Sequence, residues 1–340
     1  MSVARRTIKA IYLRFLFLTG LLKWARSRAA GRGVVVLTLH QVLRDEEYDS
    51  TRPEPGMALS ASSFQSLLEY LARHCQCILP AEAWTAQAAP RQPRVVLTFD
   101  DGWKNNFETA FPISQKYGAR FTVFICPEMI TRRLGFWTAT ANRLWWTAQR
   151  AGKLDLLRAA SPGNGSAQQW IASLKHVDSK EREVRIARLQ AALQPYEKDG
   201  VASSSEQLLT WGEIKEMAAA GIAFGSHTNT HPILTDISPA DATRELTESR
   251  RAIEAELNTC AWFAYPNGDW SQPVRELAAK AGYQLAFANS PGIWEASGDR
   301  FSIPRINVWE GSFAGITGRF SGIALEYAIF WKAWCACARV

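Results

Sequence analysis

The sequence predicts an α/β protein whose sheet is mostly parallel and either open or closed into a barrel. Strand-like runs alternate with helix-like segments along most of the chain, an order typical of βαβ units. Two runs, VVVLTL at 34–39 and RVVLTF at 94–99, are almost continuously apolar and rich in β-branched residues. Such runs indicate strands covered on both faces. With 340 residues, 47% of them hydrophobic, the chain can form one large domain or two ordinary ones.

The expected strands are short and recur along the chain. Their ranges are 34–39, 76–79, 94–99, 120–126, 222–225, 261–265, 284–288 and 302–308. Helices are expected between most of them, at 63–74, 103–117, 211–220, 239–257 and 273–281. Two helices have clear start signals, because Thr210 with Glu213 forms a capping-box pattern and Ser238 precedes Pro239 in a first turn. These starts support the alternation of strands and helices.

Three segments depart from this alternation. Residues 136–205 contain no convincing strand and include the Trp-rich stretch GFWTATANRLWW, so we expect a helical insertion between two strands. The tail at 311–340 is expected to form an apolar helix at 323–337, which is too short to span a bilayer. We therefore expect an N-terminal arm at 1–33, a main unit at 34–310 that contains the insertion, and this tail.

The net charge of +7 is concentrated in the arm. Residues 1–33 carry eight Lys and Arg and no acid, whereas residues 34–340 sum to −1. A body that binds nucleic acid needs a basic face of its own, so this balance argues against nucleic acid as a partner. Aromatic and leucine side chains beside the cations indicate instead an interfacial helix in peripheral contact with an anionic membrane surface.

Two other interpretations of the arm stay open. A helix packed on the body would have a similar composition. A secretory signal would account for the small residues Ser27 and Ala29, although Arg14 interrupts its apolar region. The longest uncharged run, 15–22, falls far short of the roughly 20 residues that span a bilayer. We expect the protein in the cytoplasm or at the membrane surface, with secretion left open.

The six cysteines do not form the dense framework of a disulfide-rich secreted domain. Two C-x-C pairs, Cys75 with Cys77 and Cys335 with Cys337, could share a metal. Small buried hydrophobes at alternating positions explain the same spacing. This usage favours a reducing compartment.

Two motifs carry residues suited to catalysis. Asp100 and Asp101 follow the run RVVLTF, and parallel sheets bind ligands at the carboxyl ends of their strands. One carboxylate can bind a metal while the other takes a proton, although an ordinary Asp-Gly turn has the same sequence. His227 and His231 follow another expected strand at a spacing typical of metal ligands, in a loop that Pro232 keeps from continuing as a helix. One Asp and two His together match a catalytic metal site with open positions.

The motif pair TFDDG and SHTNTHP resembles that of the polysaccharide deacetylases, the NodB-homology group of carbohydrate esterases. The resemblance covers roughly residues 34–135 and 206–308. It implies a distorted, incomplete (β/α) barrel, here with a helical insertion. It also implies a hydrolase that removes N-acetyl groups from the amino sugars of a polysaccharide or cell-envelope glycan with a divalent metal, usually zinc.

The resemblance assigns roles to the residues of both motifs. Asp100 matches the catalytic base of the family. Asp101, His227 and His231 match the residues that hold the metal. The partner implied by these roles is an N-acetylated glycan, from which hydrolysis releases acetate and leaves a free amine.

The third family motif is R-x-P followed by an aromatic residue, and it lies at the wall of the site. The matching stretch is Tyr265-Pro266-Asn267, which keeps the proline and lacks the arginine. The resemblance implies that the backbone N–H of Asn267 stabilises the oxyanion together with the metal. The missing arginine normally orients the base. Arg305 could replace it, and a structural ion pair would explain Arg305 equally well.

A histidine that acts as general acid is also implied, usually in an L-x-L-H motif near the end of the family's domain. No histidine follows His231, but LTLH at 37–40 ends the first expected strand. This order resembles the poly-N-acetylglucosamine deacetylases, in which that strand comes first. We therefore expect His40 to protonate the leaving amine. A histidine packed at the barrel rim is the alternative.

Other functions compete with hydrolysis of a glycan. A catalytically weak carbohydrate-binding relative would explain the missing arginine, and a membrane-surface assembly protein of a polysaccharide pathway would use the arm and the tail. A metal hydrolase for another C–N bond would use the same ligands. In the insertion, Trp137, Trp145 and Trp146 would either stack on sugar rings or pack in a core.

Overall fold

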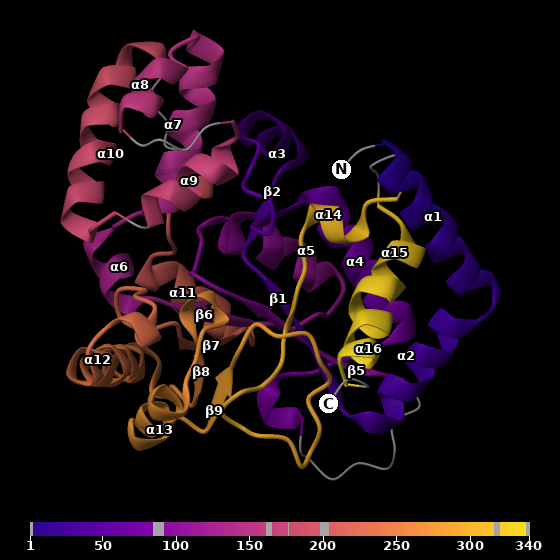
Figure 1. Ribbon diagram of the computed structural model, residues 1–340. Coiled ribbons are helices and arrows are strands. Elements are labelled where there is room, and N and C mark those ends of the chain that lie inside the picture. Colours follow the sequence, from indigo (N-terminus) through magenta and orange to yellow (C-terminus); the bar gives the residue numbers. More distant parts are fainter. Residues whose placement is uncertain are drawn as a thin grey trace.

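The protein forms a curled parallel sheet surrounded by helices (Figure 1), in a computed structural model that describes residues 3–83, 92–160, 165–175, 177–197, 204–315 and 320–337. The strands are β1 (Val34–Leu39), β4 (Gln76–Cys77), β5 (Arg94–Phe99), β6 (Thr122–Ile125), β7 (Ala223–Ser226), β8 (Trp262–Ala264), β9 (Leu285–Phe287) and β10 (Ile306–Asn307). Their order is β10-β1-β5-β6-β7-β8-β9, with β4 beside β5, and all of these pairs are parallel. The expected incomplete (β/α) barrel is confirmed.

The ring of strands closes through the segment that precedes β10. Phe287 in β9 forms an isolated parallel bridge with Ile303, and β10 pairs with β1. The first and last strands of the chain are therefore neighbours. The strand expected at 302–308 is wrong in extent, because Pro304 has no N–H for a ladder and only β10 is regular.

Alternate residues of the strands face opposite sides of the sheet. Val34 and Val36 belong to an inner apolar cluster, whereas Leu37 packs in the outer core under the helices. Because the side-chain period of a strand is two, Thr38 and its partner Thr98 also point inward. Their hydroxyl oxygens lie 3.3 Å apart. The inside of the barrel thus changes from apolar to polar toward the carboxyl ends of its strands.

Helices cover the outer face of the sheet. They include α4 (Ala61–His74), α5 (Phe111–Lys116), α6 (Pro127–Arg132), α11 (Trp211–Ala219), α12 (Pro239–Leu257) and α13 (Gln272–Lys280). Thr210 and Glu213 form the expected capping box, and the Ser238 hydroxyl accepts a backbone N–H of the first turn of α12. The helix expected at 103–117 begins only with a π-helical turn at Asn106–Ala110, because the preceding residues pair with the segment before α11.

A small second sheet lies between β1 and α4, where none was expected. Its elements are β2 (Gln41–Leu43), α3 (Asp45–Thr51) and β3 (Ala58–Ser60), with β2 and β3 parallel. Strands of three residues are too short to give a hydrophobic pattern. The Glu310 carboxylate, in α14 (Glu310–Phe313), accepts the Ser60 N–H at 2.9 Å and ties this sheet to the barrel.

The segment between α6 and α11 contributes a helical bundle. Its helices are α7 (Trp137–Ala151), α8 (Leu154–Ala160), α9 (Ala167–Lys175) and α10 (Ser179–Leu193). Figure 1 shows the bundle at one end of the molecule, beside α3. Trp145 and Trp170 lie in an apolar core of the bundle's own, with ring centroids 6.1 Å apart. Trp145 therefore packs in a core, whereas Trp146 is partly exposed and Trp137 lies against the Arg182 guanidinium.

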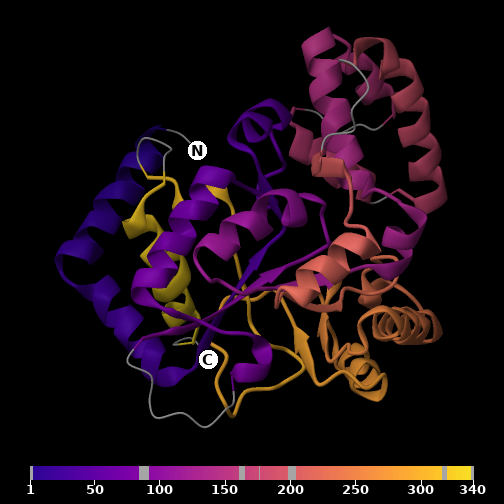
Figure 2. The same ribbon diagram turned by 180° about the vertical axis from the view of Figure 1, so that it is seen from behind.

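The two ends of the chain pack together on the barrel, away from this bundle (Figures 1 and 2). Their helices are α1 (Val3–Leu18), α2 (Leu21–Arg32), α15 (Gly322–Glu326), a π-helical segment (Tyr327–Trp331) and α16 (Lys332–Cys337). Trp24 contacts Trp334, and Arg26 binds the Glu326 carboxylate, which also accepts the Tyr70 hydroxyl at 2.6 Å. None of the helices that the structure describes combines the length and hydropathy needed to cross a membrane.

Candidate active site

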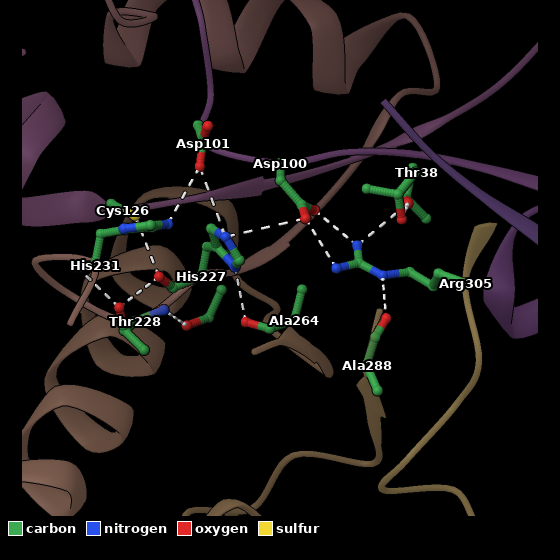
Figure 3. Close-up of polar contacts among 12 residues, drawn as sticks. Thr38, Asp100, Asp101, Cys126, His227, Thr228, His231, Ala264, Ala288 and Arg305 are labelled. Atoms are coloured by element: carbon green, nitrogen blue, oxygen red, sulfur yellow. Dashed lines mark hydrogen bonds and ion pairs between the residues drawn. The ribbon is translucent and has the colours of Figure 1, made fainter. Parts of the chain in front are cut away.

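The residues of the two sequence motifs meet at the carboxyl edge of the sheet, after β5 and β7 (Figure 3). Asp100 and Asp101 directly follow β5, whereas His227 directly follows β7 and His231 lies in the same loop. Only β6 separates β5 from β7 in the sheet, so both loops reach the same edge. Asp100, Asp101 and His227 are almost completely buried.

Asp101 reaches the site because the chain turns sharply at this point. Asp101 and Gly102 both have left-handed φ angles, of 78° and 75°. A side chain at Gly102 would place Cβ 2.9 Å from the Ile125 side chain, so a glycine fits best here. The indole N–H of Trp103 donates to Asp101 Oδ2 at 2.8 Å. This bond leaves Oδ1 directed at the histidines.

His227 and His231 face the free oxygen of Asp101. Their Nε2 atoms lie 3.6 and 3.4 Å from Asp101 Oδ1. His227 Nδ1 lies 2.8 Å from the Ala264 carbonyl, which can only accept, so the proton sits on Nδ1 and the Nε2 lone pair is free. Burial lowers the pKa of both imidazoles to about 4, so both are neutral near pH 7.

This donor set fits a divalent metal. One ligand atom from each of Asp101, His227 and His231 lies within 4.8 Å of the others. No other cluster of three such side chains occurs in the part of the chain that the structure describes, so the cysteine pairs form none there. Burial raises the pKa of the Asp101 carboxyl, and a bound cation would favour the charged form again. Neutral imidazoles beside a carboxylate are a chemically suitable set.

The loop that carries both histidines is held by a residue that the sequence analysis missed. The Glu245 carboxylate, in α12, accepts the backbone N–H groups of Asn229 and Thr230, both at 2.8 Å. His231 itself has a left-handed φ of 66° and donates its N–H to the Thr228 hydroxyl. A glutamate on the buried face of an amphipathic helix was the signal in the sequence.

Asp100 is held by Arg305, although 205 residues separate them. The guanidinium donates from both terminal nitrogens to the two Asp100 oxygens, at 2.7 and 2.8 Å, and from Nε to the Ala288 carbonyl (Figure 3). Burial alone would raise the pKa of Asp100, but the charges of Arg305 and His227 bring it down to about 2. Asp100 Oδ2 lies 4.0 Å from His227 Nε2. A permanent carboxylate thus lies beside the three-residue cluster.

His40 follows the last residue of β1 and lies at the same rim. Its backbone carbonyl accepts the Asn106 side-chain amide at 2.9 Å. The imidazole Nδ1 is buried and has no hydrogen-bond partner among the described residues. His40 is also close enough to Asp101 and His231 to shift the pKa of each by its charge. The structure therefore brings His40 to the site, with one ring nitrogen unused.

The stretch expected to form the wall of the site, residues 265–267, directly follows Ala264, whose carbonyl orients His227. Tyr265 is buried, and its hydroxyl donates to the Phe301 carbonyl at 2.9 Å. Pro266 is buried, and Asn267 has a left-handed φ of 59° with its amide bound to the Asp269 carboxylate at 2.6 Å. Positive φ angles thus recur in all three loops of the site, as strained backbone often does at functional sites.

Comparison with known proteins identifies relatives of this chain. A family model described as polysaccharide deacetylase matches residues 87–286. YxkH of Bacillus subtilis strain 168, whose name assigns it to the polysaccharide deacetylases, is 21% identical over 278 residues. That alignment covers 80% of this chain and 74% of YxkH.

Solved structures share the fold. The Streptococcus pyogenes deacetylase PplD, solved in complex with acetate, has a TM-score of 0.57 and 19% identity, covering 87% of this chain and 98% of PplD. IcaB from Ammonifex degensii has a TM-score of 0.53 and 19% identity, covering 83% of this chain and 94% of IcaB. At these identities the likeness establishes a common fold.

Proposed function

The chain belongs to the polysaccharide deacetylase family, and from this we propose that it hydrolyses the N-acetyl groups of amino sugars in a glycan with a divalent metal, zinc. The observation that carries the proposal is the different placement of two adjacent carboxylates. Asp101 joins two neutral histidines, whereas Asp100 is held as an anion by Arg305. One carboxylate is suited to bind a cation and the other to accept a proton.

Asp101, His227 and His231 are the residues that would hold the metal. When bound there, a divalent ion supplies a Lewis acid for the amide carbonyl and lowers the pKa of water. Three protein ligands leave positions open for reactants, and nitrogen donors with a carboxylate suit zinc. The Trp103 indole and the Ala264 carbonyl orient two of these ligands through hydrogen bonds.

Asp100 takes the proton of the attacking water, and its pair with Arg305 fixes the direction of its two oxygens. His40, at the end of β1, gives a proton to the leaving amine, for which its unpartnered ring nitrogen is suited. The backbone N–H of Asn267 stabilises the developing oxyanion from the turn after β8. These roles produce acetate and a free amino sugar.

The proposal accounts for the feature that favoured a catalytically weak relative. The arginine missing before Pro266 has a counterpart in Arg305, whose guanidinium contacts the base from another strand. The position of His40 on the first strand supports a poly-N-acetylglucosamine type of glycan as the substrate.

Acetate release from a panel of N-acetylated glycans tests the reaction. We expect release to stop with a chelator and to return with zinc. Metal analysis of stripped and reloaded protein tests the ligands, and His227→Ala is expected to lose its tightly bound ion. Tight stoichiometric metal in His227→Ala would overturn the ligand assignment. Absence of acetate release from the metal-loaded protein on every glycan would overturn the proposed reaction.

We also propose that α1 and α2 contact an anionic membrane surface. Seven of the twelve most exposed large hydrophobic side chains in the described residues belong to these two helices. They are Ile8, Ile11, Tyr12, Phe15, Phe17, Leu18 and Trp24. Leu13 and Leu16 on the opposite side of α1 are buried against the body. Ile8, Ile11, Phe15 and Leu18 thus form a second apolar face of α1, which is exposed, and Tyr12 at its edge contacts Tyr327.

The charges around this face favour a bilayer with anionic lipids. Arg14, Lys23 and Arg28 are exposed on the same helices, and residues 1–33 hold no acid. Each cation near an anionic surface contributes about 1 kcal/mol, in addition to the burial of apolar side chains. The contacts of α2 with Glu326 and Trp334 keep the face in place on the protein.

Sedimentation with vesicles tests this contact. The variant Ile11→Ser/Phe15→Ser should bind phosphatidylserine-containing vesicles at least about tenfold more weakly, because each side chain contributes about 1.5–3 kcal/mol when fully buried. The matched control Leu156→Ser/Val184→Ser changes exposed apolar residues of the bundle and should bind as the unmodified chain does. Equal vesicle binding by the two variants would contradict the membrane proposal. The proposal would also be wrong if Ile11→Ser/Phe15→Ser kept its vesicle binding and instead lost self-association of the protein.

A further inference from the structure

The loop between the two histidines of the site has a backbone that other elements must hold in place. Thr228 and His231 both have a left-handed φ of 66°. Such an angle is costly for a β-branched residue such as threonine, and strained backbone persists only where the surrounding structure determines it. Thr228 and Asn229 are also buried, so their backbone polar groups need partners inside the protein. The contacts around the loop therefore decide its conformation.

Glu245 provides three of these contacts from α12. Its Oε2 atom accepts the backbone N–H groups of Asn229 and Thr230, both at 2.8 Å, and its Oε1 atom accepts the Thr230 hydroxyl at 2.6 Å. Glu245 is only 8% exposed, and hydrogen bonds to a charged acceptor are roughly twice as strong as those to a neutral one. All three bonds reach residues between the histidines, so Glu245 acts on the loop rather than on a metal ligand.

The first turn of α6 contacts the same loop through different groups. The Glu128 backbone N–H donates to the Asn229 carbonyl at 3.2 Å, and the Asn229 side-chain amide donates to the Glu128 carboxylate at 2.8 Å. These two bonds hold Asn229 alone, whereas the backbone N–H groups of Asn229 and Thr230 both go to Glu245. The loop is therefore attached to two helices, and Glu245 is the acceptor for two consecutive N–H groups of its backbone.

The two histidines depend on this loop to different degrees. His227 directly follows β7, and its Nδ1 atom lies 2.8 Å from the Ala264 carbonyl, so the strand and this contact place its ring. His231 lies four residues further along, beyond the two residues that Glu245 holds. Its Nε2 atom lies 3.4 Å from Asp101 Oδ1, and the corresponding distance for His227 is 3.6 Å. The separation of the two imidazoles at the metal site is thus set through the loop that Glu245 holds.

We infer that Glu245 is a positioning residue, which raises the affinity of the site for its metal by holding the loop in the conformation that places His231 beside Asp101. The inference rests on the metal site of the proposed function and requires no contact between Glu245 and the ion. A site that is competent to bind for only part of the time has its apparent affinity reduced by that fraction. Loss of the three bonds to Glu245 lets the loop adopt other conformations, and part of the free energy of metal binding is then used to order it.

Titration of the metal-stripped protein with Co²⁺, followed by the absorption of the bound ion, tests the inference. Glu245→Leu removes all three acceptors at similar size and should bind Co²⁺ about 10–100-fold more weakly, as is usual for outer partners of metal ligands. Glu245→Gln keeps one oxygen for the N–H groups and loses the charge, so its affinity should fall only about 2–10-fold. The matched controls Glu248→Leu and Glu248→Gln should bind Co²⁺ as the unmodified chain does. Glu248 lies one turn further along α12, is exposed, and contacts the loop at the Asn229 side chain, at 3.4 Å.

Amide hydrogen exchange separates positioning of the loop from a general role in stability. In the metal-free protein, residues 228–231 should exchange faster in Glu245→Leu while the strands of the barrel keep their protection. Loss of protection throughout the barrel, or unmodified Co²⁺ affinity in folded Glu245→Leu, would overturn the inference and leave the proposed reaction in place. If Glu245→Leu does not fold, unmodified affinity in Glu245→Gln overturns it instead. Absence of Co²⁺ binding by the unmodified chain would overturn the metal site and this inference together.

Discussion

The barrel rim and a cavity of about 870 Å³ between the helical bundle and the small second sheet share Trp103 and differ in how their polar groups are satisfied. At the rim, Asp100 has Arg305 and His227 has the Ala264 carbonyl, so these side chains are held before any ligand arrives. Beside the cavity, Asn142 leaves one buried oxygen without a partner among the described residues. The difference indicates that the side chains at the rim are preorganised, whereas beside the cavity one buried acceptor is left without a hydrogen bond from the described residues.

The largest effect is expected from Asp100→Asn, which removes the proposed base and keeps the shape of the side chain. Acetate release should fall by about 10²–10⁴, the usual contribution of a general base. Metal analysis should still find the ion, because Asp100 is not among the three ligands. Asp101→Asn is the matched change and should lose the ion. Near-normal turnover by metal-loaded Asp100→Asn would show that Asp100 is only a residue of the turn and not the base.

His40→Ala tests whether the rim also contains the acid. The kcat should fall by about 10², at the lower end of the range for proton transfer, because water can also protonate the amine. Metal content should not change. The pH–rate profile of the variant should differ from that of the unmodified enzyme.

The control for this variant is His74→Ala, on the outer helix α4, which should keep both the rate and the pH profile. If His40→Ala folds, binds metal and retains the unmodified kcat and pH profile, then His40 is a packed residue of the rim and the acid must be sought elsewhere.

Trp103→Phe tests the boundary between the two regions and has the smallest expected effect. Loss of the N–H bond to Asp101 should weaken metal affinity about 10–100-fold, as is usual for partners of metal ligands. Trp146→Phe is the matched control, because it loses an indole N–H bond on the cavity side only. A competition titration with a coloured chelator measures both. Equal metal affinities of Trp103→Phe and Trp146→Phe would show that the rim and the cavity are independent of each other.

The rim could be predicted in large part because its residues follow strands with strong patterns. RVVLTF leads into the two aspartates, and the barrel order then brings the histidine loop to the same edge. The contact of Arg305 with Asp100 could not be derived from spacing. It depends on β10 pairing with β1, and β10 is too short for a pattern. Glu245 was missed because its helix was considered only for its apolar face.

The cavity could not be predicted at all. It depends on α7 lying beside the chain after α3, and neither periodicity nor charge in the two segments indicates that they meet. The three tryptophans at the start of the bundle have similar local sequence, yet Trp145 is buried in the bundle core while Trp146 lines the cavity. Which face of a helix turns inward depends on long-range packing, and tertiary contacts override local propensity.

The pairing of β1 with β10 has a consequence for the newly made chain. Domains fold as units and the N-terminal part of a chain emerges from the ribosome first, so Asp100 is present long before Arg305, which follows it by 205 residues. A buried carboxylate without its cation is strongly destabilising. A nascent chain that stops before β10 therefore lacks the cation that pairs with Asp100 and cannot complete its ring of strands. Translation itself thus delays the assembly of this part of the rim until β10 has been made.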